Sequence, residues 1–328
     1  MFKVFGDKAV KISSTTFSEI QYKESDMEEL LRKNIDMICD EEESMLIVGK
    51  QVRNSQNGIS DLTAVDNKGN IVLIEIKRDR KDIEGRKEAF EFQAIRYAAS
   101  YATIEDPGDL VSKIYAPYIE KYRNEFENNS LTSVELGMRK LMEFLQENGA
   151  EDSFNKSQKI ILIASDFDEQ TLSAVSWLNS NNVDITCFKM IPYKINEEVY
   201  IHIEKVLPLN TYKDYYVDFL ERPGVNSVKK QSITRRSLPK ITDMLEWGVV
   251  KVGDTIVAKG REDEATLLPS GNVEVNGEEV SLQKWLKDLF GWSSVQTYVF
   301  AIHKLSGKSL ADIRREYMEN EHQNRTDA

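Results

Sequence analysis

The sequence predicts an α/β domain built on a mixed β-sheet, followed by a small α+β domain. In the first two-thirds of the chain, short apolar runs of strand length alternate with longer stretches of helical periodicity. Such alternation is typical of a sheet with helices packed against it. In the last third, short β-like segments are separated by glycine-centred turns and followed by two helical stretches, which indicates the smaller unit.

Length and composition bound the domain organisation. The chain has 328 residues, 41% of them hydrophobic and 30% charged, so it is too long for a single typical core and too apolar to be disordered. Periodicity is lost around Arg222-Pro223-Gly224 and the following run rich in Ser, Lys and Arg, which favours a linker. We expect a first domain over residues 1–207, a basic linker over 208–239 and a second domain over 240–328.

Neither a membrane span nor a secretion signal is expected. The longest uncharged apolar stretches, such as residues 160–164, are of strand length and far short of the roughly 20 residues that a spanning helix needs. Cys39 and Cys187 suit reduced, buried thiols better than a disulfide framework, and the three histidines lack metal-ligand spacing. The sequence therefore predicts a cytoplasmic protein, not bound to a membrane, whose metal chemistry would depend on carboxylates.

The charge of the chain is unevenly distributed. Its formal net charge is −12, yet residues 223–328 hold 15 basic and 15 acidic side chains, so the first part of the chain carries the excess. An acidic balance disfavours loose coating of DNA but allows a local basic track. No acid lies between Arg222 and Asp243, and this stretch contains five basic residues: Lys229, Lys230, Arg235, Arg236 and Lys240.

The periodicity predicts a definite order of elements. An amphipathic helix is expected over residues 24–39, with Ser25 or Asp26 as its N-cap. Strands are expected over 45–48, 60–65, 71–77, 160–164, 184–190 and 200–206, and further helices over 84–101, 110–126, 134–147 and 168–180. In the second domain, strands are expected over 249–252, 255–258, 265–268 and 272–275, and helices over 282–290 and 310–319.

One predicted hairpin brings ionisable residues together. Asn67-Lys68-Gly69 is typical of a three-residue turn with Gly69 in the left-handed conformation. In the register that this turn sets, Asp61 faces Glu75, and Lys77 lies on the same face because strand side chains alternate. Two carboxylates so close repel each other unless a cation lies between them, and oxygen ligands suit Mg²⁺ or Mn²⁺. The hypothesis is metal-dependent phosphodiester hydrolysis, in which Lys77 stabilises the negative transition state or helps to orient the attacking water.

A simpler interpretation of the same segment remains open. Ile74-Glu75-Ile76-Lys77 also matches an ordinary amphipathic strand with a weak surface ion pair. The position of Asp61 in register, together with the apolar neighbours of all three residues, favours the end of a central strand that faces a cleft.

These residues resemble the PD-(D/E)XK nuclease superfamily, whose pattern is a lone Asp followed on the next strand by (Asp/Glu)-X-Lys. Here Ser60 replaces the proline that usually precedes the Asp. The resemblance covers roughly residues 20–207 and implies a restriction-endonuclease-like core flanked by helices. It also implies metal ligation by Asp61, Glu75 and the Ile76 carbonyl, with Lys77 catalytic.

The resemblance implies two supporting residues as well. Glu28 matches a third acid that the family often adds from the preceding helix, and Gln93 matches a glutamine that recurs in members similar to mismatch and restriction endonucleases. Each also has an ordinary structural explanation. Acids near a helix start are favoured by the helix dipole, and Gln93 shares a helix face with Tyr97 that could simply bound the core. Arg78 and Asp79 are expected on an exposed strand end.

The C-terminal third resembles the RAMA domain over about residues 238–317. The similarity lies in turns and packing residues such as Gly248-Val249-Val250-Lys251-Val252-Gly253-Asp254 and Leu310-Ala311-Asp312-Ile313-Arg314. It implies a domain that reads modified DNA, with Lys229, Lys230, Arg235 and Arg236 contacting phosphates. Those charges equally suit a solvated linker. Four aromatic residues could form a binding pocket or the domain core: Trp285, Trp292, Tyr298 and Phe300.

Three functional hypotheses follow. The first is a DNA endonuclease directed by modification, acting in restriction or phage defence, and the second is a repair nuclease for mismatched or structured DNA. The third is a DNA-binding protein with a vestigial nuclease core. A homodimer is a reasonable expectation for an enzyme that cuts both strands.

Overall fold

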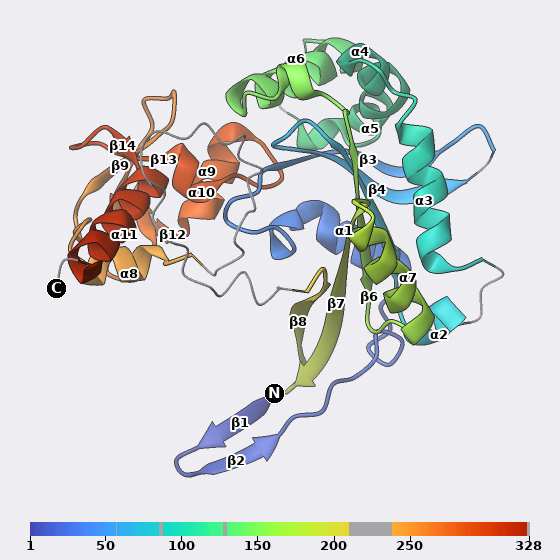
Figure 1. Ribbon diagram of the computed structural model, residues 1–328, viewed down its shortest axis with the longest axis horizontal. Coiled ribbons are helices and arrows are strands. Elements are labelled where there is room, and N and C mark those ends of the chain that lie inside the picture. The colour runs from blue at the N-terminus through green and yellow to red at the C-terminus, as the bar shows by residue number, and fades with distance from the viewer. Residues whose placement is uncertain (57, 85–87, 127–129, 210–237, 327–328) are drawn as a thin grey trace. The chain divides into compact units, whose positions relative to one another are not determined.

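The computed structural model describes residues 1–56, 58–84, 88–126, 130–209 and 238–326 (Figure 1). The contacts divide the chain into two compact units. The first unit comprises Met1–Pro208 together with Leu286–Thr297, and the second comprises Leu209–Trp285 together with Tyr298–Ala328. The segment Leu286–Thr297 thus belongs to the first unit, although it lies inside the range expected for the C-terminal domain. Most of the expected basic linker lies outside the described residues.

The first unit is α/β, as the sequence predicts, and is centred on a mixed six-stranded sheet with the order β3-β4-β5-β6-β7-β8. The pairs β3/β4, β4/β5 and β7/β8 are antiparallel, whereas β5/β6 and β6/β7 are parallel. The strand bounds are Met45–Arg53 (β3), Ile59–Asp66 (β4), Ile71–Lys77 (β5), Gln158–Ala164 (β6), Asp184–Ile195 (β7) and Glu198–Leu207 (β8). Each strand expected in this region is present, and several are longer than the pattern indicated.

The central strand β5 explains why the sheet forms around this segment. All seven of its residues, Ile71–Lys77, are buried, since β4 and β6 flank it in the sheet and helices contact it. Burial of aliphatic side chains such as Ile71, Leu73 and Ile74 contributes roughly 1.5–3 kcal/mol each. The same burial forces Glu75 and Lys77, which end the strand, to lie out of water.

The turn before β5 has the expected geometry. Gly69 adopts a positive φ of 81°, and the Asp66 N–H donates to the Asn70 carbonyl at 3.0 Å, which closes a three-residue connection. A residue with a side chain would be strained at that φ. The predicted register is confirmed from Val65, which pairs with Ile71, through to Leu62, which pairs with Ile74.

Helices cover the sheet. Helix α1 packs against β4 and β5, α3 against β4, β5 and β6, and α7 against β7 and β8 (Figure 1). A second group of short helices and the long α6 pack on one another, and the turn that begins with Val111 contacts β3. The α-helix bounds are Glu24–Lys33 (α1), Arg80–Glu84 (α2), Phe90–Tyr101 (α3), Pro107–Leu110 (α4), Ala116–Lys121 (α5), Ser133–Glu147 (α6) and Glu169–Ser180 (α7).

Several of the expected helices differ in extent. The helix expected over 110–126 is a π-helical turn, Val111–Tyr115, followed by α5, Ala116–Lys121, and a 3-10 turn, Arg123–Glu125. The helix expected over residues 24–39 ends at Lys33, because the side chain of Asn34 donates to the Leu30 carbonyl at 2.9 Å and caps the last turn. Its N-cap is Lys23, not Ser25 or Asp26, and Asp26 instead accepts the Lys23 N–H at 2.8 Å. The helix expected over 84–101 is not continuous, because α2 ends at Glu84 and α3 begins at Phe90; residues 85–87 between them lie outside the described part of the chain.

The segment Leu286–Thr297 is fixed to the first unit by backbone contacts. The N–H groups of Ser293 and Ser294 both donate to the Met45 carbonyl at 2.9 Å, and Ser293 Oγ accepts the Ile47 N–H at 2.9 Å. Trp292 packs edge-on against Phe144 with ring centroids 4.9 Å apart. Through these contacts, the segment Leu286–Thr297 adds to the core of the first unit beside the start of β3.

The second unit is a small α+β structure with a six-stranded sheet in the order β12-β11-β10-β9-β13-β14. Its elements are α8 (Ile241–Glu246), β9 (Thr255–Ala258), β10 (Glu264–Leu267), β11 (Val273–Val275), β12 (Glu278–Val280), β13 (Ala301–His303), β14 (Lys308–Ser309) and α11 (Leu310–Thr326). The helices α9 (Leu282–Phe290) and α10 (Thr297–Phe300) each have residues in both units. The strand expected over residues 249–252 is absent. Those residues form a turn in which Asp254 accepts the Lys251 N–H at 2.6 Å.

The cysteines and the aromatic residues of the C-terminal third agree with their structural interpretations. Cys39 and Cys187 are free thiols, and burial raises the pKa of Cys187 to about 12. All four aromatic residues considered for a pocket are buried: Trp285, Trp292, Tyr298 and Phe300. No helix in the described part of the chain is both long and apolar enough to cross a membrane.

Candidate active site

The candidate site lies where β5 ends beside the start of β4. The side chains of Asp61 on β4, and of Glu75 and Lys77 on β5, are all buried. Burying a charged group costs several kcal/mol unless partners compensate for the lost hydration. Three such groups at the end of a central strand therefore require a polar arrangement that holds them, and the contacts below describe it.

Asp61 joins the two strands through its side chain. Its Oδ2 accepts the backbone N–H of Ile76 at 2.8 Å, while its Oδ1 accepts from Gln51 Nε2 at 3.3 Å. The backbone pairing runs only as far as Leu62 and Ile74, one residue short of the expected Asp61–Glu75 pair. The carboxylate of Asp61 thus accepts a backbone hydrogen bond from β5, which fixes this carboxylate beside the end of that strand.

Lys77 is in contact with the same group of acceptors. Its Nζ donates to the Ile76 carbonyl at 2.6 Å and lies 3.8 Å from Asp61 Oδ2. It also lies 3.2 Å from Glu24 Oε1 and 5.4 Å from the centre of the Phe90 ring. With a relative exposure of 2%, Lys77 is a buried ammonium that carboxylates, a carbonyl and an aromatic face surround.

Glu75 is fully buried, and helix α3 supplies a partner. Gln93 Nε2 lies 3.5 Å from Glu75 Oε2, at the outer limit of a hydrogen bond, and 3.3 Å from the Tyr97 hydroxyl. Tyr97 in turn accepts the Ile59 N–H at 3.2 Å. The structure therefore brings Gln93 to the predicted acid, and Tyr97 links the helix to the start of β4.

Glu28 is buried on the opposite flank of Asp61. Its Oε1 accepts from Gln51 Nε2 at 2.7 Å, and Lys50 Nζ lies 3.9 Å from its Oε2. Burial, and secondarily the charge of Asp61, raise the pKa of the Glu28 carboxyl above its ordinary value. The side chain of Gln51 therefore bridges two carboxylates that would otherwise repel each other.

A buried arginine fixes the helix that carries these acids. Arg32 on α1 forms ion pairs with Glu29 at 2.7 Å and with Glu125 at 2.8 Å, and it donates to the Tyr118 hydroxyl at 2.9 Å. Lys50 also reaches Glu29 at 2.8 Å. Because α1 is tied to its neighbours in this way, Glu24 and Glu28 are held beside the two strands.

The sequence interpretation missed three residues of this arrangement. Gln51 lies two residues after a register shift between Ile47 and Gly49 in the β3/β4 pairing and has a positive φ of 56°, and no local sequence pattern predicts either feature. Glu24 lies four residues before Glu28, so helical spacing alone could have placed both on one face of α1. Asp79 is buried and accepts the N–H groups of Phe17 and Ser18 at 3.3 Å, so its expected position on an exposed strand end is wrong.

The donor set fits a hard divalent cation. The predicted ligands are the carboxylates of Asp61 and Glu75 and the carbonyl of Ile76, and oxygen donors of these types are what Mg²⁺ and Mn²⁺ prefer. The Lys77 ammonium already contacts two of the three, so the set attracts positive charge. Within the described ranges, no three His, Cys, Asp or Glu side chains are grouped so that they could hold a metal ion by themselves.

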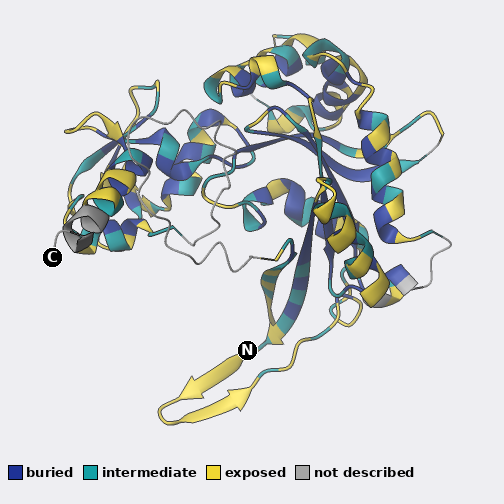
Figure 2. Cartoon of the chain, in the orientation of Figure 1, coloured by how far each residue is buried: buried dark blue, intermediate teal, exposed yellow. Residues whose placement is uncertain are grey.

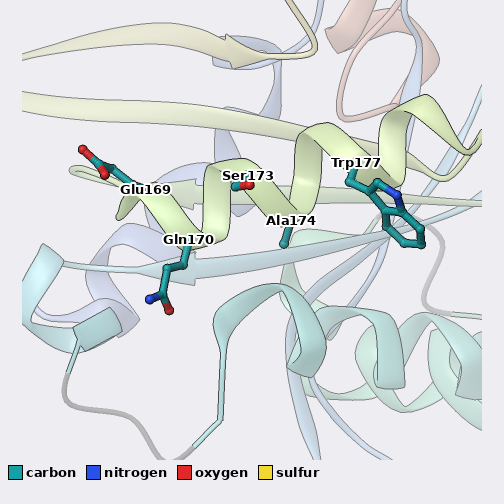
Figure 3. Close-up of a pocket in the computed structure, with 5 residues that line it drawn as sticks. All are labelled: Glu169, Gln170, Ser173, Ala174 and Trp177. Carbon is teal, nitrogen blue, oxygen red and sulfur yellow. The ribbon is translucent and has the colours of Figure 1, made fainter.

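The four residues expected to contact phosphates are outside the described residues: Lys229, Lys230, Arg235 and Arg236. A surface hollow of about 530 Å³ is lined by five residues of α7, including the exposed Trp177 (Figure 3). Asp61, Glu75 and Lys77 do not line that hollow, so it is separate from the candidate site.

Comparisons of this chain with protein-family models, with curated proteins and with solved structures find no match.

Proposed function

We propose that this protein is a metal-dependent DNA endonuclease that hydrolyses phosphodiester bonds. The observation that supports this proposal best is the burial of Asp61, Glu75 and Lys77 near the end of the central strand, where Lys77 Nζ lies 3.8 Å from Asp61 Oδ2. A fold that only needed stability would gain little from burying these charges, because apolar side chains of similar size pack there at a lower cost. Buried ionisable groups of this kind are concentrated at functional sites.

Each residue of the candidate site has a role in this proposal. Asp61, Glu75 and the Ile76 carbonyl would hold Mg²⁺ or Mn²⁺, which when bound would polarise a phosphodiester and acidify a water. Lys77 places a positive charge beside those ligands, where it stabilises the negative charge that develops on the phosphate. Gln93 orients Glu75, and Glu28 acts through Gln51 on Asp61.

The arrangement of strands supports the same proposal. A mixed six-stranded sheet, with an antiparallel hairpin that supplies the acids and parallel strands beyond it, agrees with the restriction-endonuclease-like core that the motif implies. The second unit is a small α+β structure, consistent with a separate DNA-reading module of the RAMA type. We therefore propose cleavage directed by DNA modification, as in restriction or phage defence.

Cleavage assays test this proposal directly. The purified protein is incubated with Mg²⁺ or Mn²⁺ and with two versions of one plasmid, unmodified and carrying adenine and cytosine modifications. Lys77→Met is tested in parallel, with Lys156→Met, an exposed lysine outside the site, as the matched control. Cleavage of one modified form, retained by the control and lost in Lys77→Met, is the expected result.

Other outcomes favour the alternatives. Cleavage of both plasmid forms retains the nuclease and rejects these modifications as the signal. Cleavage of mismatched or branched duplexes alone favours the repair nuclease, which the position of Gln93 beside Glu75 also fits. Binding of DNA and of Mn²⁺ without cleavage of any substrate favours a non-catalytic DNA-binding protein.

A further inference from the structure

The chain begins with a two-stranded ribbon that lies outside the main sheet. Strands β1 (Phe2–Phe5) and β2 (Lys8–Lys11) pair antiparallel, with Phe2 opposite Lys11 and Phe5 opposite Lys8. Every residue of both strands is exposed, as Figure 2 shows. An isolated two-stranded hairpin is only marginally stable in water, so this ribbon gains stability if a further surface covers it.

The exposed side chains of the ribbon are unusually apolar. Phe2, Val4, Phe5 and Val10 have relative exposures between 53% and 68%. Because side chains alternate along a strand, Phe2 and Val4 lie on one face and Phe5 on the other. Val10 on β2 is opposite Lys3 and therefore shares the face of Phe5. Apolar groups on both faces of a ribbon call for a protein surface, since phosphates and water offer no apolar contact.

The backbone of the ribbon is also available for pairing. Among the described strands, β1 and β2 pair only with each other, and β8 pairs only with β7. β8 is thus an edge of the main sheet, and it exposes Val199 and Tyr200. Unpaired strand edges are templates for strand addition.

The ribbon is not placed to cover β8 of its own chain. The Thr15 N–H donates to the Pro192 carbonyl at 3.0 Å, which ties the base of the ribbon to β7. Pro192 on β7 pairs with Ile201 on β8. The N-terminal segment therefore approaches β7 from the side that faces away from β8. Within the described part of the chain, the outer edge of β8 therefore carries no strand.

The charges of the two elements are complementary. Residues 1–12 contain Lys3, Lys8 and Lys11 against one acid, Asp7. The strand β8 itself contains two glutamates, Glu198 and Glu204, and one lysine, Lys205. In a chain of net charge −12, a basic ribbon is attracted to the acidic body of another copy.

We propose that the ribbon of one copy adds to the outer edge of β8 in a second copy, and that the exchange is reciprocal. In a dimer with a two-fold axis, each ribbon pairs with the β8 edge of the other copy, so the same two surfaces meet twice in an isologous interface. Strand addition would pair the edge of β8 and cover the apolar side chains of the ribbon. This inference does not depend on the proposed nuclease activity.

Mass measurement tests the inference without DNA or added metal. Light scattering or sedimentation equilibrium of the full chain is expected to give a dimer that dissociates on dilution. Deletion of residues 1–12 and the substitution Val4→Glu are each expected to shift the dissociation constant at least 10-fold toward monomer. Val252→Glu, at another exposed valine in the second unit, is the matched control and is expected to leave the mass unchanged.

A paired cysteine experiment identifies the surface. Val4→Cys and Val199→Cys variants, carrying different tags, are mixed and oxidised, and an inter-chain disulfide between the two tags is expected. Each variant oxidised alone is the control for Cys39 and Cys187. A monomer at all concentrations, or a dimer that survives deletion of the ribbon, would overturn the inference. An unchanged mass together with weaker DNA binding by the deletion variant would also overturn it and assign the ribbon to DNA.

Discussion

The ammonium of Lys77 lies 3.2 Å from the Glu24 carboxylate and 2.6 Å from the carbonyl of Ile76. One contact involves the first turn of α1 and the other the strand that carries Lys77 itself. The position of this ammonium is therefore set by the packing of a helix on the end of a strand. The Ile76 carbonyl is also a proposed metal ligand. Lys77 and a bound cation would therefore share this acceptor.

Lys77→Met is expected to separate metal binding from cleavage. Loss of the positive charge is expected to reduce cleavage about 100- to 1,000-fold, the usual effect of removing a group that stabilises transition-state charge. Freeing the Ile76 carbonyl and Asp61 from the ammonium is expected to strengthen Mn²⁺ binding, measured by calorimetry. Weaker Mn²⁺ binding in this variant, with the fold intact, would argue against the proposed ligand set.

Glu24→Gln tests whether Glu24 positions Lys77. We expect kcat to fall about 10-fold with little change in KM. This effect is at the lower end of the range for residues that act through another group, because Glu24 is partly exposed. Glu169→Gln is the matched control, since Glu169 is also the first residue of its helix and has the same favourable position toward the helix dipole. Equal effects of the two substitutions on kcat would assign Glu24 to helix stability alone.

Gln93→Leu tests the partner of Glu75. Without the amide, the Glu75 carboxylate loses a donor that orients it, and we expect the metal affinity or the cleavage rate to fall about 10-fold. Gln170→Leu, an exposed glutamine of α7 seen in Figure 3, is the control. Wild-type affinity and rate in Gln93→Leu would favour a purely structural role for this helix face.

Glu28→Gln is expected to stabilise the protein, in a manner that depends on pH. The folded-state pKa of Glu28 is raised by burial and by Asp61, so stability falls as the pH rises from the ordinary carboxyl value through the folded pKa. Above that range the variant should melt at a higher temperature than wild type, and near pH 4 the difference should vanish. A variant that is less stable at pH 8 would show that the charged form of Glu28 is favoured by the fold.

Glu29→Gln is expected to behave in the opposite way. Hydrogen bonds from Arg32 are the main cause that lowers the pKa of Glu29 to about 2, so its contribution is present above pH 4.5 and is lost as the pH falls toward 2. Thermal melting of the variant should therefore be lower than wild type at neutral pH and equal to it near pH 2. A constant difference across this range would mean that packing, not charge, causes the effect.

Arg32→Met removes the buried guanidinium that holds α1. Two carboxylates and a tyrosine hydroxyl lose their donor, and we expect a loss of about 2–3 kcal/mol in the free energy of unfolding. This is below the cost of breaking a fully buried pair, because Glu29 and Glu125 remain more than a third exposed to water. Urea denaturation measures the loss, and a change under 0.5 kcal/mol, about that of an ordinary surface substitution, would contradict the prediction.

The sequence by itself determined the local features of the site. The turn at Asn67-Lys68-Gly69 sets the hairpin register, because a three-residue connection with Gly69 in the left-handed conformation allows only that pairing. Strand alternation then places Lys77 near Asp61, as the 3.8 Å separation of Nζ and Oδ2 shows. The α/β class follows from the same local patterns.

Only the tertiary structure decided which other groups reach that site. Gln51 bridges Glu28 and Asp61, Glu24 contacts Lys77, and Asp79 is buried against the segment before α1. These contacts join residues that are 10 to 62 positions apart, whereas periodicity reports only neighbours within a few residues. The same limit explains why one expected helix proved to be two and why the segment Leu286–Thr297 joined the first unit. Hydrophobic patterns specify which face of an element is buried, but the packing partner is set by contacts between distant parts of the chain.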